Sequence, residues 1–363
     1  MSSVIGNKLK ISIFGESHGE GIGVAIDGLP SGFAIDLDYI NQQMKRRIPG
    51  KSILSSPRKE EDEYKILSGF FQGKTTGTPL AAIIYNKDKK SSDYGESKNL
   101  LRPGHSDYTG YIKYSSYNDY RGAGHFSGRL TAPLLFAGAV AMQFLESKEI
   151  YIGSHIKSIY NINDDDAENI ETEVLKNLRE MNFPVISSEK GMLMTDSIAK
   201  YKNAGNSLGG IVETFIINVP AGYGEPFFDS VESKISHMIF SIPAVKGIEF
   251  GAGFKITELT GKEANDEFMV AGDKIITATN NNGGILGGIS NGMPITFRTA
   301  IKPTPSIHCA QNTVDISSME NTIINIHGRH DPCIVPRVVP VIEGAAALVI
   351  LDLILERDGE KWN

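Results

Sequence analysis

Cysteine is scarce in this chain, whose 363 residues include only Cys309 and Cys333. Two cysteines cannot build a disulfide framework, so we expect a protein of the reducing cytosol. Positive charge is also in short supply, because 36 lysines and arginines stand against 43 aspartates and glutamates and the formal net charge is −7. This balance disfavours nucleic acid or an anionic membrane as the main partner. A local group of arginines could still bind a small anion in a cleft.

A long uninterrupted apolar run is missing as well. The longest apolar stretch, VVPVIEGAAALVILDLIL, is interrupted by Glu343 and Asp352, whereas a membrane span needs about 20 apolar residues. The N-terminal residues have neither the apolar stretch nor the small-residue cleavage site of a signal peptide. We therefore expect no membrane association, and we interpret the C-terminal stretch as a buried helix.

Hydrophobic patterns predict short strands and helices of varied length. Strands are expected at 8–14, 23–29, 79–86, 211–219 and 295–301. Amphipathic helices are expected from about residue 37, capped by Asp36 or Asp38 and ending before Pro49, at 170–181, and at 229–241 with Asp229 as cap. The charge run 57–65 is interpreted as a solvated face. This irregular order favours an α+β fold, and without a repeat or linker we expect one domain over residues 1–363.

Two further segments, 132–145 and 344–354, are apolar on every side. A helix without a polar face must be covered all round. The sequence therefore predicts helices enclosed between other layers of the fold.

Five glycine-rich segments carry most of the residues suited to chemistry. Histidine suits proton transfer near neutral pH, and arginine suits phosphate and carboxylate. Their convergence would indicate a site for a substrate with more than one negative charge, although each arginine could instead pair with an acidic residue. The segments are GESHGEGIG (15–23), LRPGHSDYTG (101–110), DYRGAGHFSGR (119–129), NNGGILGGISNG (281–292) with KPTPS (302–306), and HGRHDPCIVPR (327–337).

Other site types find less support. The spacing of His327, His330 and Cys333 invites a metal site, but Pro332 would break the helix that this spacing needs, so we expect no metal. GAGHFSG (122–128) resembles a dinucleotide fingerprint only loosely. His155 and His237 lie outside the motifs and are interpreted as surface or helix-packing residues, and Cys333 as a small buried apolar residue.

In order and spacing, these segments resemble the signature segments of the chorismate synthase family. The likeness rests on GESHG (15–19), RPGHSDYT (102–109), DYRGAG (119–124), GGILGGIS (283–290), KPT (302–304) and GRHDPC (328–333), and extends to DGLPSG (27–32), RRIPG (46–50) and VPAGYGEP (219–226). It covers nearly the whole chain.

The resemblance implies a β-α-β sandwich, with a helical core between two mainly antiparallel sheets, in a cytosolic homotetramer. It implies a carbon–oxygen lyase of the shikimate pathway to aromatic amino acids. The reaction is the anti-1,4-elimination of phosphate and the C6 proton from 5-enolpyruvylshikimate 3-phosphate (EPSP), which gives chorismate and uses reduced FMN without net redox change.

The resemblance also assigns roles to residues. The catalytic residues would be His18, a proton donor to the departing phosphate, His105, beside the flavin, and Asp331, which assists removal of the C6 proton. The FMN-binding residues would be His125, Phe126, Ser127, Ala244, Gly287, Lys302, Pro303, Thr304, Pro305, Ser306 and Arg329. The residues for the substrate's phosphate and carboxylates, or for NADP, would be Arg46, Arg47, Arg102, Arg129 and Arg337.

The chain departs from the family pattern in places. His125 and Phe126 replace an Arg-Ser pair, Pro243 replaces Asn or Gln, and Ile53 replaces an arginine that some relatives associate with pyridine nucleotide. We therefore expect a monofunctional enzyme that receives reduced flavin from a separate reductase. An NADPH-dependent flavin oxidoreductase on the same fold and a non-catalytic phospho-ligand-binding protein are the alternative functions.

Overall fold

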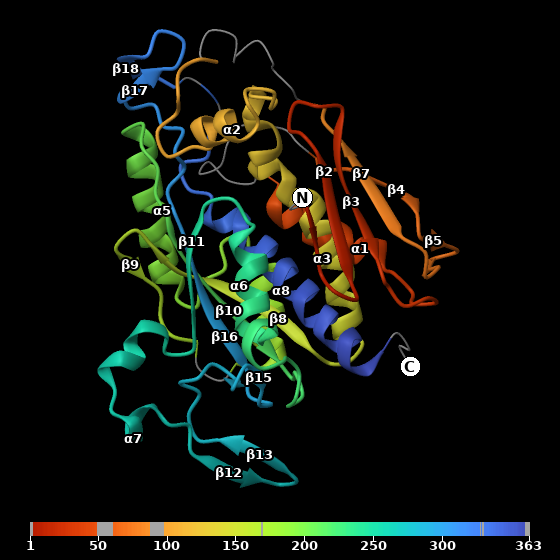
Figure 1. The fold of residues 1–363 in the computed structure, drawn as a ribbon. Coiled ribbons are helices and arrows are strands. Elements are labelled where there is room, and N and C mark those ends of the chain that lie inside the picture. Colours follow the sequence, from red (N-terminus) through yellow and green to blue (C-terminus); the bar gives the residue numbers. More distant parts are fainter. Residues whose placement is uncertain are drawn as a thin grey trace.

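The protein is described by a computed structural model over residues 3–48, 61–87, 98–167, 170–326, 328 and 330–359. These residues form two five-stranded antiparallel sheets, and a layer of long helices lies between them (Figure 1). One hydrophobic core includes residues of both sheets and of the helices between them. The expected α+β sandwich is confirmed.

The first sheet lies at the N-terminal end of the chain and has the strand order β1-β2-β3-β7-β4. Helix α1 (Leu37–Arg47) lies between β3 and β4 in the chain. Asp36 caps its N-terminus by accepting the N–H of Asp38 and Tyr39, and the helix ends before Pro49 as expected. The strands are β1 (Val4–Ile5), β2 (Lys10–Gly15), β3 (Gly21–Asp27), β4 (Tyr64–Ser68) and β7 (Leu80–Tyr85), with the short pair β5 (Phe70–Phe71) and β6 (Lys74–Thr75) beside them.

The second sheet has the order β11-β16-β10-β8-β9 and presents a different apolar set on each face. Val212 and Ile216 belong to the main core, whereas Phe215 and Ile217 pack with Leu175 of α4 on the opposite face. This period of two lets one sheet be covered by helices on both sides. The elements are β8 (Tyr151–Ile159), β9 (Ile162–Asn163), β10 (Gly210–Ile217), β11 (Val245–Phe250), β16 (Ile295–Ile301) and α4 (Thr172–Glu180).

The central layer is built on α3 (Thr131–Glu146) and α8 (Val335–Asp358), the two helices predicted from all-round apolar sequence. They cross where Gly138 meets Gly344, because a Cβ on Gly138 would lie 2.3 Å from the α-carbon of Gly344. The helical segments Arg121–Glu146, which includes α3, and Val335–Asp358 are long and apolar enough to cross a membrane, but their apolar windows are 89% and 100% buried inside the protein, as in core helices.

Helix α8 begins at Val335, earlier than predicted, with Pro336 in its first turn. The two acidic residues within its apolar sequence, Glu343 and Asp352, are both buried and both have polar partners. Glu343 pairs with Arg46, and Asp352 accepts the N–H groups of Asn7, Lys8 and Leu9. Buried charges persist only with such partners.

Helix α6 (Val231–Phe240) packs beside α8. Its N-cap is Ser230, whose side chain accepts the N–H of Ser233, so the expectation of Asp229 as cap was wrong by one residue. The smaller elements are α2 (Asp107–Lys113), α5 (Ser188–Asn203), α7 (Gly261–Ala264), β12 (Phe268–Ala271), β13 (Lys274–Thr277), β14 (Ile285–Leu286), β15 (Ile289–Ser290), β17 (Gln311–Asp315) and β18 (Glu320–Ile324).

Candidate functional site

A cavity of about 670 Å³ lies where several of the glycine-rich segments meet. Its lining includes parts of segments 102–106, 122–129, 240–246, 302–306 and 330–341. Its volume is typical of small-molecule sites, which measure roughly 300–1,000 Å³. Both central helices begin at this cavity, because Thr131 of α3 and Arg337 of α8 line it. The positive ends of their dipoles therefore favour an anionic ligand there.

The cavity lining has more cations than carboxylates although the protein is acidic, and each of its four arginines pairs with a carboxylate, Asp62, Asp107 or Asp331. Among the described lining residues Asp331 is the only carboxylate, against four arginines and two lysines. In a cleft with low-dielectric walls, such an excess of one sign raises the local concentration of the opposite charge. The cations are Arg47, Arg102, Arg129, Arg337, Lys246 and Lys302.

Asp62 fixes two of these arginines. This carboxylate is fully buried and accepts from Arg47 (Nη2 to Oδ2, 2.5 Å) and from Arg129. Burial raises the pKa of Asp62, but the two guanidinium groups outweigh burial and hold this pKa below its usual range. The expectation that residues 57–65 form a solvated face was therefore wrong at Asp62; residues 57–60 lie outside the described part.

The polar network around Asp62 extends to both sides of its carboxylate. Arg129 Nε donates to Asn86 (3.2 Å), whose amide donates to the carbonyls of Glu16 and Gly19 in the first glycine-rich turn. On the other side Arg337 donates to the carbonyl of Arg47 and pairs with Asp331. Segments far apart in the sequence are thus tied to one another by hydrogen bonds around the cavity.

His18 lies in the turn after β2 and packs against the α-carbon of Gly122, which lines the cavity. A Cβ at Gly122 would lie 2.1 Å from the imidazole Cε1, so only glycine fits there. The hydroxyl of Ser17 lies 3.2 Å from His18 Nδ1 and donates to the carbonyl of Gly122. His18 as a whole residue is only 9% exposed; it lies behind Gly122 and is not itself among the residues that line the cavity.

His105 and Arg102 line the cavity together and share one carboxylate. Asp107, at the start of α2, accepts from the Arg102 guanidinium (2.7 Å) and lies 2.8 Å from His105 Nδ1. Burial raises the pKa of Asp107, but these hydrogen bonds outweigh burial and hold the pKa well below its usual range. An ionised Asp107 therefore orients both side chains.

Most of the predicted flavin-binding residues line the same cavity: His125, Phe126, Ser127, Ala244, Lys302, Thr304, Pro305 and Ser306. His125 Nδ1 lies 2.8 Å from the carbonyl of Gly15. The backbone N–H of Lys302 donates to the carbonyl of Ala244 (2.9 Å), and its ammonium donates to the carbonyl of Gly104. Burial and the nearby Lys246 lower the pKa of Lys302.

A few predicted site residues are placed elsewhere. Arg46 pairs with Glu343 and lines a second cavity, Gly287 lies in the turn between β14 and β15, and Pro303 is outside the lining. Arg329, like His327 of the suggested metal spacing, falls outside the described residues. Among the residues that are described, no group of three or more potential metal ligands occurs.

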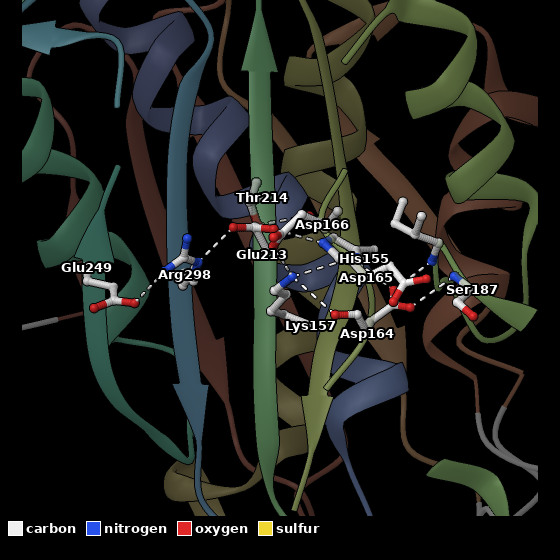
Figure 2. Close-up of polar contacts among 12 residues, drawn as sticks. His155, Lys157, Asp164, Asp165, Asp166, Ser187, Glu213, Thr214, Glu249 and Arg298 are labelled. Atoms are coloured by element: carbon white, nitrogen blue, oxygen red, sulfur yellow. Dashed lines mark hydrogen bonds and ion pairs between the residues drawn. The ribbon is translucent and has the colours of Figure 1, made fainter. Parts of the chain in front are cut away.

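A second polar cluster crosses the face of the second sheet that carries Glu213 (Figure 2). His155 is completely buried between Asp164 (2.8 Å) and Glu213 (2.9 Å), and Arg298 links Glu213 to Glu249. Burial lowers the pKa of His155, but its two carboxylate partners outweigh burial and raise it. The expectation of a surface or helix-packing histidine was wrong, because nothing in the local sequence reveals partners 9 and 58 residues away.

The chain can now be compared with known proteins. The model of the chorismate synthase family matches residues 9–355. The chain is 46% identical over 354 residues to the chorismate synthase of Pyrococcus abyssi, covering 97% of each chain, and 44% identical over 355 residues to that of Dehalococcoides mccartyi, covering 98% of this chain and 97% of the relative.

Solved structures agree with this match. A crystal structure of chorismate synthase superposes with a TM-score of 0.76 and 29% sequence identity, and the match covers 97% of this chain and 93% of that one. The chain therefore belongs to the chorismate synthase family, the carbon–oxygen lyases that convert EPSP into chorismate.

Proposed function

We propose that the cationic cavity is the place where this protein eliminates phosphate from EPSP, with reduced FMN bound in the same cavity. The observation that carries the proposal is the convergence of four arginines and two lysines on one cavity, with His105 and Asp331 in its lining and His18 at its wall. EPSP carries one phosphate and two carboxylates, so it needs several such cations. Arg47, Arg102, Arg129 and Arg337 are proposed to bind these groups.

The roles in proton transfer are assigned to His18, Asp331 and His105. The reaction breaks the C3–O bond, with its electron pair leaving on the phosphate, and breaks the C6–H bond, whose electron pair enters the new diene. His18 is proposed to donate a proton to the departing phosphate, since a protonated phosphate leaves more readily. Asp331, held by Arg337, is proposed to assist removal of the C6 proton. His105, oriented by Asp107, is proposed to hold a proton beside the cofactor.

The lining suits a flavin mononucleotide. Phe240, Ile242 and Val245 offer apolar surface for a ring system, while Lys302 and Ser306 offer donors for a phosphate. His125, Phe126, Ser127, Ala244 and the 303–305 turn are proposed to complete the FMN site, with Arg329 as a further contact, whereas Gly287 lies outside this cavity. When bound, reduced FMN would supply transient electron density to the substrate during C–O cleavage.

Turnover with limiting cofactor tests this function. Under anaerobic conditions, the protein is mixed with EPSP, a catalytic amount of chemically reduced FMN and no electron acceptor. We expect many equivalents of phosphate and chorismate for each flavin, because the elimination has no net redox change. Flavin oxidation in step with product would instead favour an oxidoreductase and sink the lyase proposal.

Variants of the histidines separate an enzyme from a phospho-ligand-binding protein. For His18→Ala and His105→Ala we expect EPSP binding to persist while phosphate release falls by at least about 10²-fold, the usual contribution of one acid–base group. His237→Ala, an exposed position on α6, is the matched control. Unchanged phosphate release in both variants would contradict the assigned roles.

We further propose that the whole chain acts as one domain in a cytosolic homotetramer, supplied with reduced flavin by a separate reductase. Exposed apolar side chains support an assembly: Phe228 is 91% exposed, and the β12–β13 hairpin, which extends away from the sheets, exposes Phe268, Val270 and Ile275 (Figure 1). Patches of this kind mark interaction surfaces. Analytical ultracentrifugation tests this proposal: a tetramer is expected, and a monomer at micromolar concentration would contradict it.

A further inference from the structure

Asn86 lies between the turn that carries His18 and Arg129, one of the cations of the substrate cavity. It directly follows β7, whose last residue pairs with the first residue of β3, and its backbone N–H donates to the carbonyl of Glu20 (3.1 Å). The residue is only 9% exposed and does not itself line the cavity. An effect of Asn86 on the reaction would therefore pass through the groups that it holds.

The side-chain amide of Asn86 is bonded to both of these groups. Its nitrogen donates to the carbonyls of Glu16 (2.9 Å) and Gly19 (3.1 Å), and its oxygen accepts from Nε of Arg129 (3.2 Å). Only one orientation of the amide satisfies these bonds, because a guanidinium N–H can only donate and a backbone carbonyl can only accept. The amide therefore joins the turn to the arginine in a defined geometry.

The two carbonyls are the ends of the turn in which His18 lies. The N–H of Gly19 closes this turn by donating to the carbonyl of Glu16 (3.0 Å). Asn86 thus holds the turn on both sides of the histidine. The imidazole packs closely against Gly122 of the cavity wall. A shift of the turn would therefore move the imidazole relative to that wall.

We propose that Asn86 is a positioning residue for the elimination, which keeps the turn of His18 in a fixed place relative to Arg129. The proposal rests on the roles given above to His18 as proton donor and to Arg129 as a cation for the substrate. Asp62 holds the same guanidinium through Nη1, so the amide joins the turn to a group that is itself fixed. The departing phosphate has to meet the acid and the cation together, and a misplacement of about 1 Å can lower a rate about 10²-fold.

Asn86→Asp tests this role with almost no change in size. Its carboxylate can still accept from Arg129, but it has no N–H for the carbonyls of Glu16 and Gly19, and its charge repels them. Anaerobic phosphate release with EPSP and reduced FMN gives kcat and KM. We expect kcat to fall at least about tenfold while KM for EPSP changes less than about threefold. Asn161→Asp, at an exposed position between β8 and β9, is the matched control and should keep both wild-type values.

A double-mutant cycle with His18→Ala separates positioning from a merely structural role. Residues that act as one unit have non-additive effects, so in the His18→Ala background Asn86→Asp should lower kcat by less than about threefold. A residue needed only for stability would lower kcat by the same factor in both backgrounds. Asn86→Ala passes through the same cycle and keeps the test decisive if Asn86→Asp does not fold.

Three results would each overturn the proposal: wild-type kcat in the Asn86 variants, an effect on KM alone in Asn86→Asp, or an equal fall of kcat in both backgrounds. Wild-type kcat in His18→Ala alone would show instead that the proposed acid role has failed, and the inference would fall with it. The two failures are distinguishable, because only the second appears in a variant that leaves Asn86 unchanged.

Discussion

The buried carboxylate of Asp62 gives the sharpest prediction for stability. It accepts from both Arg47 and Arg129, and its side chain is completely buried. Asp62→Asn keeps the shape but leaves the two guanidinium groups without a negative partner. Removing one partner of a buried ion pair costs about 3–5 kcal/mol, and since asparagine retains one acceptor oxygen we expect about 3 kcal/mol, the lower end of this range.

This loss of unfolding free energy corresponds to a decrease in melting temperature. The entropy of unfolding is about 2.1 cal/mol/K per residue, or roughly 0.76 kcal/mol/K for 363 residues. A loss of about 3 kcal/mol therefore lowers the melting temperature by about 4 °C. Asp27→Asn, at an exposed position of β3, is the matched control and should stay within about 1 °C.

The assay is thermal unfolding followed by circular dichroism at several pH values. The depressed pKa of Asp62 means that its stabilisation is fully present above the ordinary aspartate pKa of about 3.9 and is lost as the pH falls through the folded-state value. The difference between Asp62→Asn and the wild type should therefore be constant near neutral pH and shrink in acid. Melting of the variant within about 1 °C of the wild type at pH 7 would refute this reasoning.

Three other changes probe the helical core, the second sheet and the orientation of His105. His155→Gln should lower the free energy of unfolding by about 3 kcal/mol, measured by urea titration with His237→Gln as the control. This loss should become smaller as the pH rises through the raised pKa of His155. An equal loss in both variants would contradict the buried ion pairs. Gly138→Ala should lower the free energy of unfolding by about 1–3 kcal/mol, because its Cβ would collide with Gly344. Gly261→Ala is the control, because a Cβ at Gly261 would meet open space. Equal melting temperatures of the two variants would exclude a tight crossing of α3 and α8. Asp107→Asn should lower kcat/KM about 10²-fold through misplacement of Arg102 and His105, with the melting temperature as control, and full activity would show that Asp107 orients neither.

Elements with a strong local signal were predictable from the sequence. The α3 helix and the end of α8 followed from apolar residues on every side, and α1 followed from helical spacing and a cap at Asp36 or Asp38, of which Asp36 is the observed cap. The beginning of α8 was missed because Pro336 and Pro340 suggest a break in the helix. Pro336 lies in the first turn, where proline is tolerated, and Pro340 lies inside the helix at a buried position. β8 was missed because the polar residues Ser154, His155, Lys157 and Ser158 interrupt its apolar pattern, although three of them are buried. α5 was missed because only Gly191, Met194 and Ile198 are buried along its length.

The site was predictable in its motifs but not in its supporting contacts. The glycine-rich segments contain most of the predicted histidines and arginines. Residues of 101–110, 119–129, 302–306 and 327–337 line one cavity, whereas no residue of 15–23 or 281–292 does, and Arg46 and Pro303 also lie outside its lining. Asp62, however, lies in a charge run that looks solvated, and only tertiary structure brings Arg129 to it from 67 residues away. Pairings of this range leave no periodic trace in a single sequence, and the same holds for His155 and Glu213.

The central claim is that distant turns build a single chamber in which substrate and flavin meet. A crystal structure of the protein with FMN and EPSP tests it most directly. We predict both ligands in the 670 Å³ cavity, in contact with each other, with the EPSP anions on Arg102, Arg129 and Arg337. FMN and EPSP bound in separate cavities, or EPSP bound away from these arginines, would contradict the account.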